Sequence, residues 1–292
     1  MTIAILGSPY PEHFSKYIQH LIKKLESEHI KLIIEEEFNT FLQKNIRFNK
    51  KVSTFNSYES LKDSADFLFS IGGDGTLLNA VTYIRESEIP ILGINTGRLG
   101  FISSISADQI DDTLNDLLKD NYKINERTLL ELNTSNKLFK ENNFALNEVA
   151  VSKKDTSSMI RIDAFVDEEY LNTYWADGLV VSTPTGSTGY SLSCGGPIIM
   201  PGTNNIIITP NAPHNLNVRP IVIDDNSVVK LKVEDRDQLA LVSLDSRSRA
   251  FDSGTELTIK KANFKIKLVQ PKNSSFTSTI RHKLMWGLDK RS

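Results

Sequence analysis

The sequence has few of the features that would assign it to several common classes of protein. It contains a single cysteine, Cys194, in 292 residues, which excludes an internal disulfide and any metal site built from several cysteines. Its apolar runs are too short to cross a membrane, and the N-terminus shows a short apolar strand pattern at residues 2–6 in place of a signal peptide. We therefore expect a cytoplasmic protein without a membrane partner, in which Cys194 is a small packed side chain.

The sequence also lacks an excess of charge of either sign. Lys and Arg number 34 and Asp and Glu number 36, giving a net charge of -2. Dedicated nucleic-acid-binding proteins carry a strong basic excess, so no nucleic-acid partner is expected. The five histidines show no metal-binding spacing, and no Ser-His-Asp or Cys-His arrangement stands out. The sequence therefore assigns no metal ligand and no nucleophilic triad.

What the sequence does contain is two zones of different periodicity. Strand and helix patterns alternate in the first zone, for example a helix over 14–27, strands over 31–34, 66–71 and 90–94, and a helix over 107–120. Residues 35–51 are polar and are interpreted as a mobile insertion. After about residue 123, short segments rich in β-formers follow one another closely. We predict an α/β domain over 1–123, an all-β sandwich domain over 124–274, and a helical tail over 275–292 that packs back on the first domain.

A glycine turn with one carboxylate is the most informative motif of the first zone. Gly72-Gly73-Asp74-Gly75-Thr76 lies between a buried strand pattern and the start of a helix. Glycines let the backbone approach a ligand closely, and the amides at a helix N-terminus favour phosphate oxygens. A carboxylate repels neighbouring phosphates, so its presence here indicates a chemical role, such as holding Mg²⁺ or taking a proton from a hydroxyl. The motif indicates phosphoryl transfer to an alcohol, with a tight turn that caps a helix as the alternative.

A second glycine turn, residues 95–101, follows the strand predicted over 90–94. Ligands of open α/β sheets bind beyond the carboxyl ends of the strands, so this turn is expected on the same side as Asp74. Arg98 in this turn is interpreted as a member of a surface ion pair, with phosphate binding as the alternative.

The second zone contains a loop dense in hydroxyl groups, within residues 177–193. A strand pattern is followed by Ser, Thr and Gly residues around one aromatic ring, Tyr190. Such a loop can hydrogen-bond a base edge and ribose hydroxyls while the aromatic side chain packs on a flat ring. On the residues alone, the favoured interpretation is an ordinary Ser/Thr/Gly turn that caps a short helix.

Taken together and in order, these motifs resemble those of the NAD kinase family. The resemblance extends over nearly the whole chain and includes residues 72–78, 95–101, 147–148, 177–193, 195–197, 213–214 and 219–220. Diacylglycerol and sphingosine kinases resemble only the first of these segments. The resemblance implies a two-domain fold with the active site between the domains, and the transfer of a phosphoryl group from ATP, with Mg²⁺, to the 2′-hydroxyl of the adenosine ribose of NAD, giving NADP and ADP.

The resemblance also implies the roles of individual residues. Asp74 would be the general base, and Gly72, Gly73 and Gly75 would admit phosphates. Asn147 and Glu148 would bind the adenosine end of NAD. The other positions implied to line the NAD site are Phe101, Trp175, Asp177, Thr185, Thr188, Gly189, Tyr190, Ser191, Leu192, Ser193, Ala212 and Arg247.

Some positions depart from the commonest family pattern. Gly189 stands where the family more often has Ala, and Arg247 stands near a position that is often Gln. Trp175 leaves the preference between NAD and NADH open. A homodimer or homotetramer is expected, because families of this kind often build the pocket across subunits. The competing hypotheses are a lipid kinase of the diacylglycerol or sphingosine type and a non-catalytic regulator that binds NADP.

Overall fold

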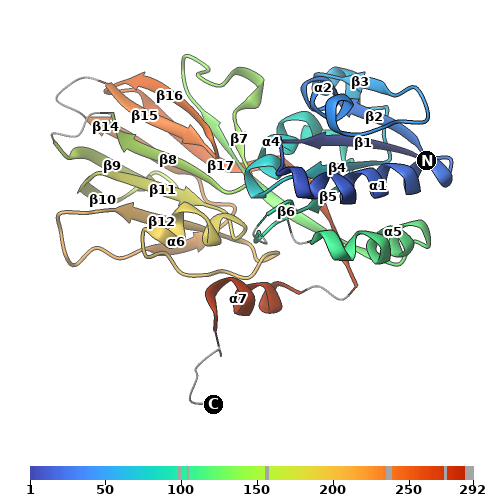
Figure 1. Ribbon diagram of the computed structural model, residues 1–292. Helices are drawn as coiled ribbons and strands as arrows, with labels where there is room; N and C mark the ends of the chain where they lie inside the picture. The colour runs from blue at the N-terminus through green and yellow to red at the C-terminus, as the bar shows by residue number, and fades with distance from the viewer. Residues whose placement is uncertain (98–99, 104, 155–157, 235–238, 273–274, 287–292) are drawn as a thin grey trace. The chain divides into compact units, whose positions relative to one another are not determined.

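The computed structural model describes residues 1–97, 100–103, 105–154, 158–234, 239–272 and 275–286 (Figure 1). The chain divides into two compact units, Met1–Glu126 with Ile266–Ser292, and Arg127–Lys265. Arg98, for which we predicted an ion pair, lies outside the described residues, as does the end of the predicted tail at 287–292.

The first unit contains a parallel sheet whose strand order reverses beside β1. The strands are β1 (Thr2–Gly7), β2 (Lys31–Glu35), β3 (Ser53–Phe55), β4 (Phe67–Ile71) and β5 (Ile91–Ile94). They pair in the order β5-β4-β1-β2-β3, and Leu268 of β17 (Glu256–Pro271) pairs in parallel with Ile91 of β5. Consecutive strands therefore run outward in one direction from β1 to β3 and in the other from β4 to β5. Ligands of such sheets bind where the order reverses, at the carboxyl ends of β1 and β4.

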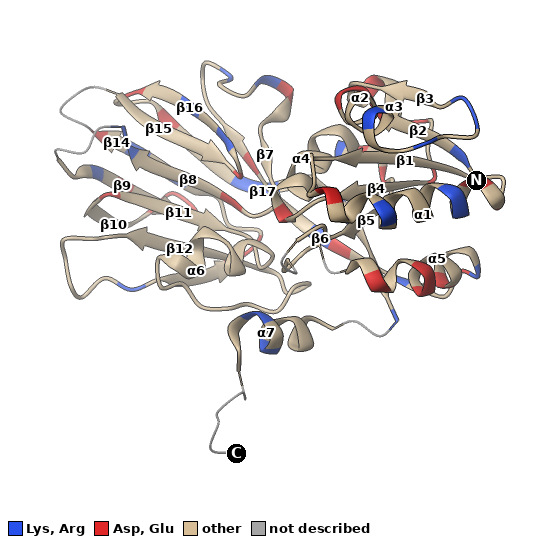
Figure 2. Cartoon of the chain, in the orientation of Figure 1, with Lys and Arg blue, Asp and Glu red and all other residues tan. Residues whose placement is uncertain are grey.

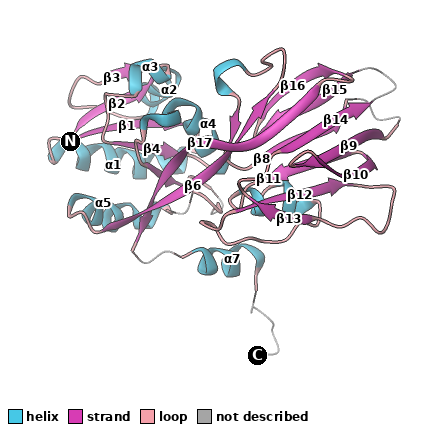
Figure 3. Ribbon diagram, turned by 180° about the vertical axis from the view of Figure 1, so that it is seen from behind, coloured by secondary structure: helices cyan, strands magenta, loops and turns pink. Residues whose placement is uncertain are grey.

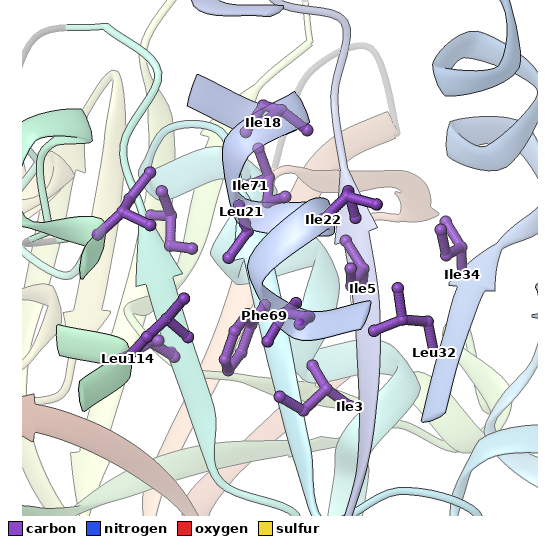
Figure 4. Close-up of a cluster of buried hydrophobic side chains, with 14 of the residues drawn as sticks. Ile3, Ile5, Ile18, Leu21, Ile22, Leu32, Ile34, Phe69, Ile71 and Leu114 are labelled. Carbon is purple, nitrogen blue, oxygen red and sulfur yellow. The ribbon is translucent and has the colours of Figure 1, made fainter. Parts of the chain in front are cut away.

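Helices α1 (Ser15–Ser27) and α5 (Ile110–Leu118) pack on one face of this sheet (Figure 4). The apolar residues of α1 recur at helical spacing, and Ile18, Leu21 and Ile22 are fully buried against strand residues of the same core. An ion pair joins the two helices, with the Lys24 ammonium 2.9 Å from an oxygen of Asp111; the basic residues of α1 and the acidic residues of α5 are visible in Figure 2. The strands are buried on both faces, as in other parallel sheets.

The prediction of a mobile insertion over residues 35–51 was wrong. The segment forms helix α2 (Glu36–Asn45), which leads towards strand β3. The Glu35 carboxylate caps the helix by accepting a hydrogen bond from the amide of Phe38 at 2.8 Å. Phe38 and Leu42, four residues apart, are buried in the core. Phe41 packs against the same core, so apolar side chains hold a helix in a segment whose other residues are polar.

The remaining helices of the first unit are short except for α4 and α7. They are α3 (Tyr58–Leu61), α4 (Asp74–Ile84) and α7 (Phe276–Leu284), together with the 3-10 turns η1 (Glu12–Phe14), η2 (Arg85–Ser87) and η3 (Ala107–Gln109). Helix α7 is the helix predicted for the C-terminal tail, and the side chain of its N-cap Ser275 accepts from the amide of Ser278. No helix in the described part of the chain is long and apolar enough to cross a membrane.

The second unit is a sandwich of two antiparallel sheets, as predicted (Figure 3). One sheet has the order β10 (Glu169–Ala176), β9 (Ile160–Val166), β14 (Val229–Glu234) and β17. The other has the order β13 (Ile221–Asp224), β12 (Asn205–Asn211), β11 (Gly178–Ser182), β8 (Glu148–Lys153), β15 (Leu239–Leu244) and β16 (Arg247–Asp252). Strands β6 (Tyr122–Asn133) and β7 (Phe144–Ala145) pair with each other around η4 (Lys140–Asn142). Apolar residues of both sheets form one core, because alternate residues of each strand point inward.

Helical structure in the second unit is confined to short turns. Besides η4, the described residues contain η5 (Gly186–Thr188) and α6 (Tyr190–Ser193), which follow β11. The hydroxyl-rich loop predicted over 177–193 is therefore a strand, a tight turn and one turn of helix.

Candidate active site

Asp74 is held by the backbone of the second glycine turn. Its Oδ2 accepts a hydrogen bond from the amide of Phe101 at 2.8 Å, and its Oδ1 accepts from the amides of Ile102 at 3.2 Å and Ser103 at 2.8 Å. Three donors fix the orientation of one carboxylate and compensate its charge. The two glycine turns, 27 to 29 residues apart, are thus joined through this side chain.

Gly100 makes this arrangement possible. A Cβ atom at Gly100 would lie 1.9 Å from Oδ1 of Asp74, so no other residue fits without moving the carboxylate. Asn95, which is buried, shapes the start of the same turn by accepting from the amide of Gly97 at 2.7 Å. The turn predicted from its glycines is therefore a cradle for Asp74.

The three glycines of the first turn have different tasks. A Cβ atom at Gly72 would lie 2.2 Å from Oγ1 of Thr76 and 2.8 Å from Oγ of Ser8, so Gly72 serves close packing where β1 and β4 end. At Gly73 and Gly75, no atom of the described residues lies within 4 Å of a Cβ position, and both glycines are exposed. Gly73 is the N-cap of α4, which leaves its N-terminal amides accessible to a phosphate at the point where the strand order reverses.

Phe101 contacts the C-terminal helix of the same unit. The ammonium of Lys283 on α7 lies 5.3 Å from the centre of the Phe101 ring. This cation–π contact places a positive charge beside the residue whose amide holds Asp74. Sequence reasoning missed Lys283, because nothing in its neighbourhood in the sequence indicates which side chain it meets.

In the second unit, Asn147 and Glu148 lie at the start of β8 under the hydroxyl-rich loop. The backbone carbonyl of Asn147 accepts from the amide of Thr183 at 2.9 Å. A Cβ atom at Gly186 would lie 2.1 Å from that carbonyl oxygen, and one at Gly189 would lie 2.9 Å from Oε2 of Glu148. The glycines of the loop thus let it close over the Asn-Glu pair. Glycine in place of alanine at 189 leaves free space beside the Glu148 carboxylate.

Two acceptors of this pair are buried without a partner. Within the described part of the chain, Oδ1 of Asn147 and Oε2 of Glu148 have no hydrogen-bond partner, and both residues are buried. Burial raises the pKa of Glu148 to about 7; the charge of Asp245 adds to this rise, and a hydrogen bond from the backbone of Tyr190 opposes it. Buried acceptors without donors are costly, which indicates a place where a ligand supplies the donors.

Exposed aromatic side chains lie near this pair and farther along the same unit. The Tyr190 ring is 41% exposed, and its hydroxyl accepts from the side-chain amide of Asn211 at 2.8 Å. Trp175 is 52% exposed at the end of β10, and its carbonyl accepts from the amide of His214 at 2.8 Å. Tyr190 is therefore oriented by a polar contact while its ring stays open to a flat ligand.

The other predicted residues of the loop divide into accessible and packed ones. Asp177 forms an ion pair with Lys153 at 2.7 Å. Oγ of Ser191 is buried and pairs with Oγ1 of Thr209 at 2.8 Å, so in this structure it contributes to packing. Thr185 is buried and its carbonyl accepts from the hydroxyl of Thr188. The side chains of Leu192, Ser193 and Ala212 are partly or fully exposed.

Arg247 makes its contacts within the protein. Its guanidinium donates to the backbone carbonyls of Asn142 and Phe144 and lies 5.4 Å from the centre of the Phe144 ring. Burial lowers the pKa of Arg247, and the nearby Asp245 opposes this. These contacts anchor the segment before β7, and they explain why an arginine stands here.

The residues above define a nucleotide-binding protein with an α/β unit and a β-sandwich unit, and the comparisons with known proteins agree. Residues 3–122 match the ATP-NAD kinase N-terminal domain, and residues 146–271 match the ATP-NAD kinase C-terminal domain. The chain is 47% identical to the NAD kinase of Christiangramia forsetii and 49% identical to that of Flavobacterium psychrophilum, with 100% of each chain covered in both cases. The protein belongs to the NAD kinase family.

Solved structures support the same fold. The crystal structure of yeast NADH kinase complexed with NADH is similar with a TM-score of 0.88 over 99% of this chain and 89% of that chain, at 23% identity. The crystal structure of an NAD kinase from Archaeoglobus fulgidus in complex with ATP is also similar, with a TM-score of 0.76 and 27% identity. The similarity covers 98% of this chain and 99% of the Archaeoglobus chain. The predicted family and fold class are confirmed.

Proposed function

We propose that this protein transfers the terminal phosphoryl group of ATP to the 2′-hydroxyl of the adenosine ribose of NAD, giving NADP and ADP. In this reaction the O–H bond of the ribose hydroxyl breaks, an O–P bond forms, and ADP leaves with the electrons of the broken P–O bond. The observation that carries the proposal is the pair of buried, unpartnered acceptors on Asn147 and Glu148 beside the open Tyr190 ring. Membership of the NAD kinase family supports it.

The polar groups of Asn147 and Glu148 have matching groups on an adenosine. The ionised Glu148 carboxylate accepts from ribose hydroxyls, and the Asn147 amide has an acceptor and donors for a ring edge. The Tyr190 ring offers a face on which a flat base can pack. Trp175 is assigned to the nicotinamide end of the same substrate.

In the first unit, Asp74 is assigned as the general base that removes the proton of the 2′-hydroxyl. Its oxygens are aimed by three amides, so the base is positioned before the substrate arrives. The accessible N-terminal amides of α4, beside Gly73, are assigned to phosphate oxygens.

The residues of this turn fit a Mg²⁺ ion that arrives with ATP. No cluster of three or more His, Cys, Asp or Glu residues that could hold a metal occurs among the described residues, so the ion would be held mainly by phosphates and water. Oδ2 of Asp74 accepts one hydrogen bond from the residues that the structure describes, and a lone pair on this oxygen could face such an ion. When bound, Mg²⁺ neutralises phosphate charge during transfer.

The test is the formation of NADP by the purified protein with NAD, ATP and Mg²⁺, read by an NADP-specific coupled dehydrogenase. Asp74→Asn should retain folding and NAD binding and lose most turnover, at least about 100-fold, because an amide cannot take the proton and because its NH2 group would face a backbone amide of the cradle. Asp66→Asn is the matched control, since Asp66 also accepts from a backbone amide, that of Thr2 at 2.6 Å, but precedes β4. Turnover in Asp74→Asn equal to that of the control would remove Asp74 from the mechanism.

Absence of NADP with the wild-type protein, using NAD or NADH and ATP or polyphosphate, would favour the alternative functions. A lipid kinase should then sediment with anionic vesicles, whereas a non-catalytic regulator should bind NADP tightly without turnover. The family match gives no support to either alternative.

We extend the proposal to assembly into a homodimer or homotetramer. Apolar side chains are exposed on the second unit at Met200, Leu216 and Val222, and Leu216 is 84% exposed. Exposed apolar groups of this kind occur at contacts between subunits. Light scattering during gel filtration measures the mass directly, and a monomer at micromolar concentration would contradict this part of the proposal.

A further inference from the structure

Asp245 is a carboxylate that the sequence did not single out, and it holds the backbone of the Asn-Glu pair. It lies in the turn between β15 and β16. Its Oδ2 accepts from the amide of Leu146 at 2.9 Å, and its Oδ1 accepts from the amides of Asn147 at 2.8 Å and Glu148 at 3.2 Å. Its own amide donates to the carbonyl of Glu148 at 3.0 Å. Four hydrogen bonds thus connect one turn residue to three consecutive residues.

The backbone conformation of Asp245 indicates that this position needs the carboxylate side chain and not only a residue that fits the turn. Its φ angle is +53°, in the left-handed region that favours glycine. If the turn required only a left-handed backbone, glycine would adopt it without strain. An aspartate here accepts the conformational cost and gains three amide donors for its carboxylate.

We infer that Asp245 is a positioning residue for substrate binding, which aims Asn147 and Glu148 at the adenosine of NAD through its bonds to their backbone. The inference rests on the proposed function, because it concerns the same binding pair. Asp245 need not touch the substrate, since its effect passes through the backbone before β8.

The charge of Asp245 has a second effect on this pair. Burial, followed by the charge of Asp245, raises the pKa of Glu148 to about 7. The other titratable groups that face this cluster are Tyr190 and Cys194 in the loop above Glu148, Asp177 beside Tyr190, and Arg247 beside Asp245. Burial raises the pKa of Asp245 as well, and the three amides and Arg247 oppose this rise. The two carboxylates are therefore coupled, and the proton taken up near neutral pH belongs to the pair. NAD binding by the ionised Glu148 should therefore weaken as the pH falls through about 7.

Two variants separate positioning from turn geometry. Asp245→Asn retains a residue that tolerates the left-handed region, but it removes the charge and turns one acceptor into a donor that faces an amide. Asp245→Gly relieves the backbone and removes both acceptor oxygens, and with them all three hydrogen bonds from the amides. We expect the KM for NAD to rise about 10-fold in the first variant and at least about 10-fold in the second, with kcat changed less than KM.

The matched control is Asp167→Asn. Asp167 also has a left-handed φ, +51°, in the turn between β9 and β10, and its carboxylate also accepts from a backbone amide, that of Val228 at 2.8 Å. Its KM for NAD should equal that of the wild type.

The decisive readout is the pH profile of the KM for NAD between pH 5.5 and 8.5. In Asp245→Asn the rise of KM with falling pH should move to lower pH, because the neighbouring negative charge is gone; a purely structural defect would leave its midpoint unchanged. Wild-type KM and profile in both Asp245 variants would overturn the inference while leaving the proposed function intact. If the wild-type protein forms no NADP, the proposed function itself fails.

Discussion

Replacing Gly100 by alanine tests whether the cradle of Asp74 is needed for activity. The added Cβ would lie 1.9 Å from Oδ1, 2.6 Å from Cγ and 2.9 Å from Oδ2 of Asp74. Ordinary contacts begin near 3.4 Å, so the carboxylate or the turn must move by about 1.5 Å. A displacement of this size lengthens hydrogen bonds of 2.8 Å beyond the range in which they hold.

The size of the effect follows from these bonds. A hydrogen bond to a charged group contributes about 1.5–3 kcal/mol, so the loss of two of the three weakens the cradle by about 3–6 kcal/mol before the loop relaxes. We expect the free energy of unfolding to fall by about 2–4 kcal/mol, with part of the loss recovered by relaxation and water. Misplacing a general base by 1 Å or more costs about 100-fold in kcat.

The assay is steady-state NADP formation together with urea unfolding, with Gly97→Ala as the control. Gly97 belongs to the same turn, and the nearest atom to its Cβ position is Oδ1 of Asn95 at 4.0 Å, so alanine fits there. A Gly100→Ala enzyme whose kcat lies within about threefold of the control would refute the reasoning, because the carboxylate would then work without its cradle.

Two further variants test the second unit. Tyr190→Ala should raise the KM for NAD about 10-fold through loss of base stacking. The control Tyr170→Ala removes a ring that is 56% exposed on β10 and should leave the KM unchanged. Equal KM values in the two variants would contradict the assignment of Tyr190 to the NAD pocket. Glu148→Gln should raise the KM for NAD and yet stabilise the fold. The folded-state pKa of Glu148 is about 7 against an ordinary value of 4.5, so burying its charge costs stability above pH 7, and this cost disappears as the pH falls towards 4.5. The variant should therefore gain about 3 kcal/mol over the wild type in urea unfolding at pH 8 and almost nothing at pH 4.5, and a pH-independent difference would contradict the burial argument.

The fold was largely predictable because its elements have clear periods. Helix α1 and strands β1, β4 and β5 follow apolar patterns that depend only on neighbouring residues. Helix α2 was missed because two buried side chains, Phe38 and Leu42, fix it within a polar segment. Strand β16 leaves little alternation to detect in the sequence, because most of its side chains are polar and half-buried or exposed.

The candidate site shows the same division between local and tertiary information. The glycine turn around Asp74 and the Asn147-Glu148 pair are visible as sequence motifs because close backbone approach requires glycine, and ligand contacts require particular polar groups. The partners of these residues are not visible in the sequence. Asp245 accepts from the amide of Asn147, which is 98 residues away in the chain, and Lys283 of helix α7 lies over the ring of Phe101.

The sequence by itself determined the fold class, the family and the residues that carry the proposed chemistry, because these depend on local spacing and on the order of motifs. Tertiary structure decided how those residues are aimed. The amides that hold Asp74, the unpartnered oxygens of Asn147 and Glu148, and the clamp of Asp245 all arise from contacts between segments far apart in the chain. Such contacts depend on packing in three dimensions, which leaves no period in the sequence.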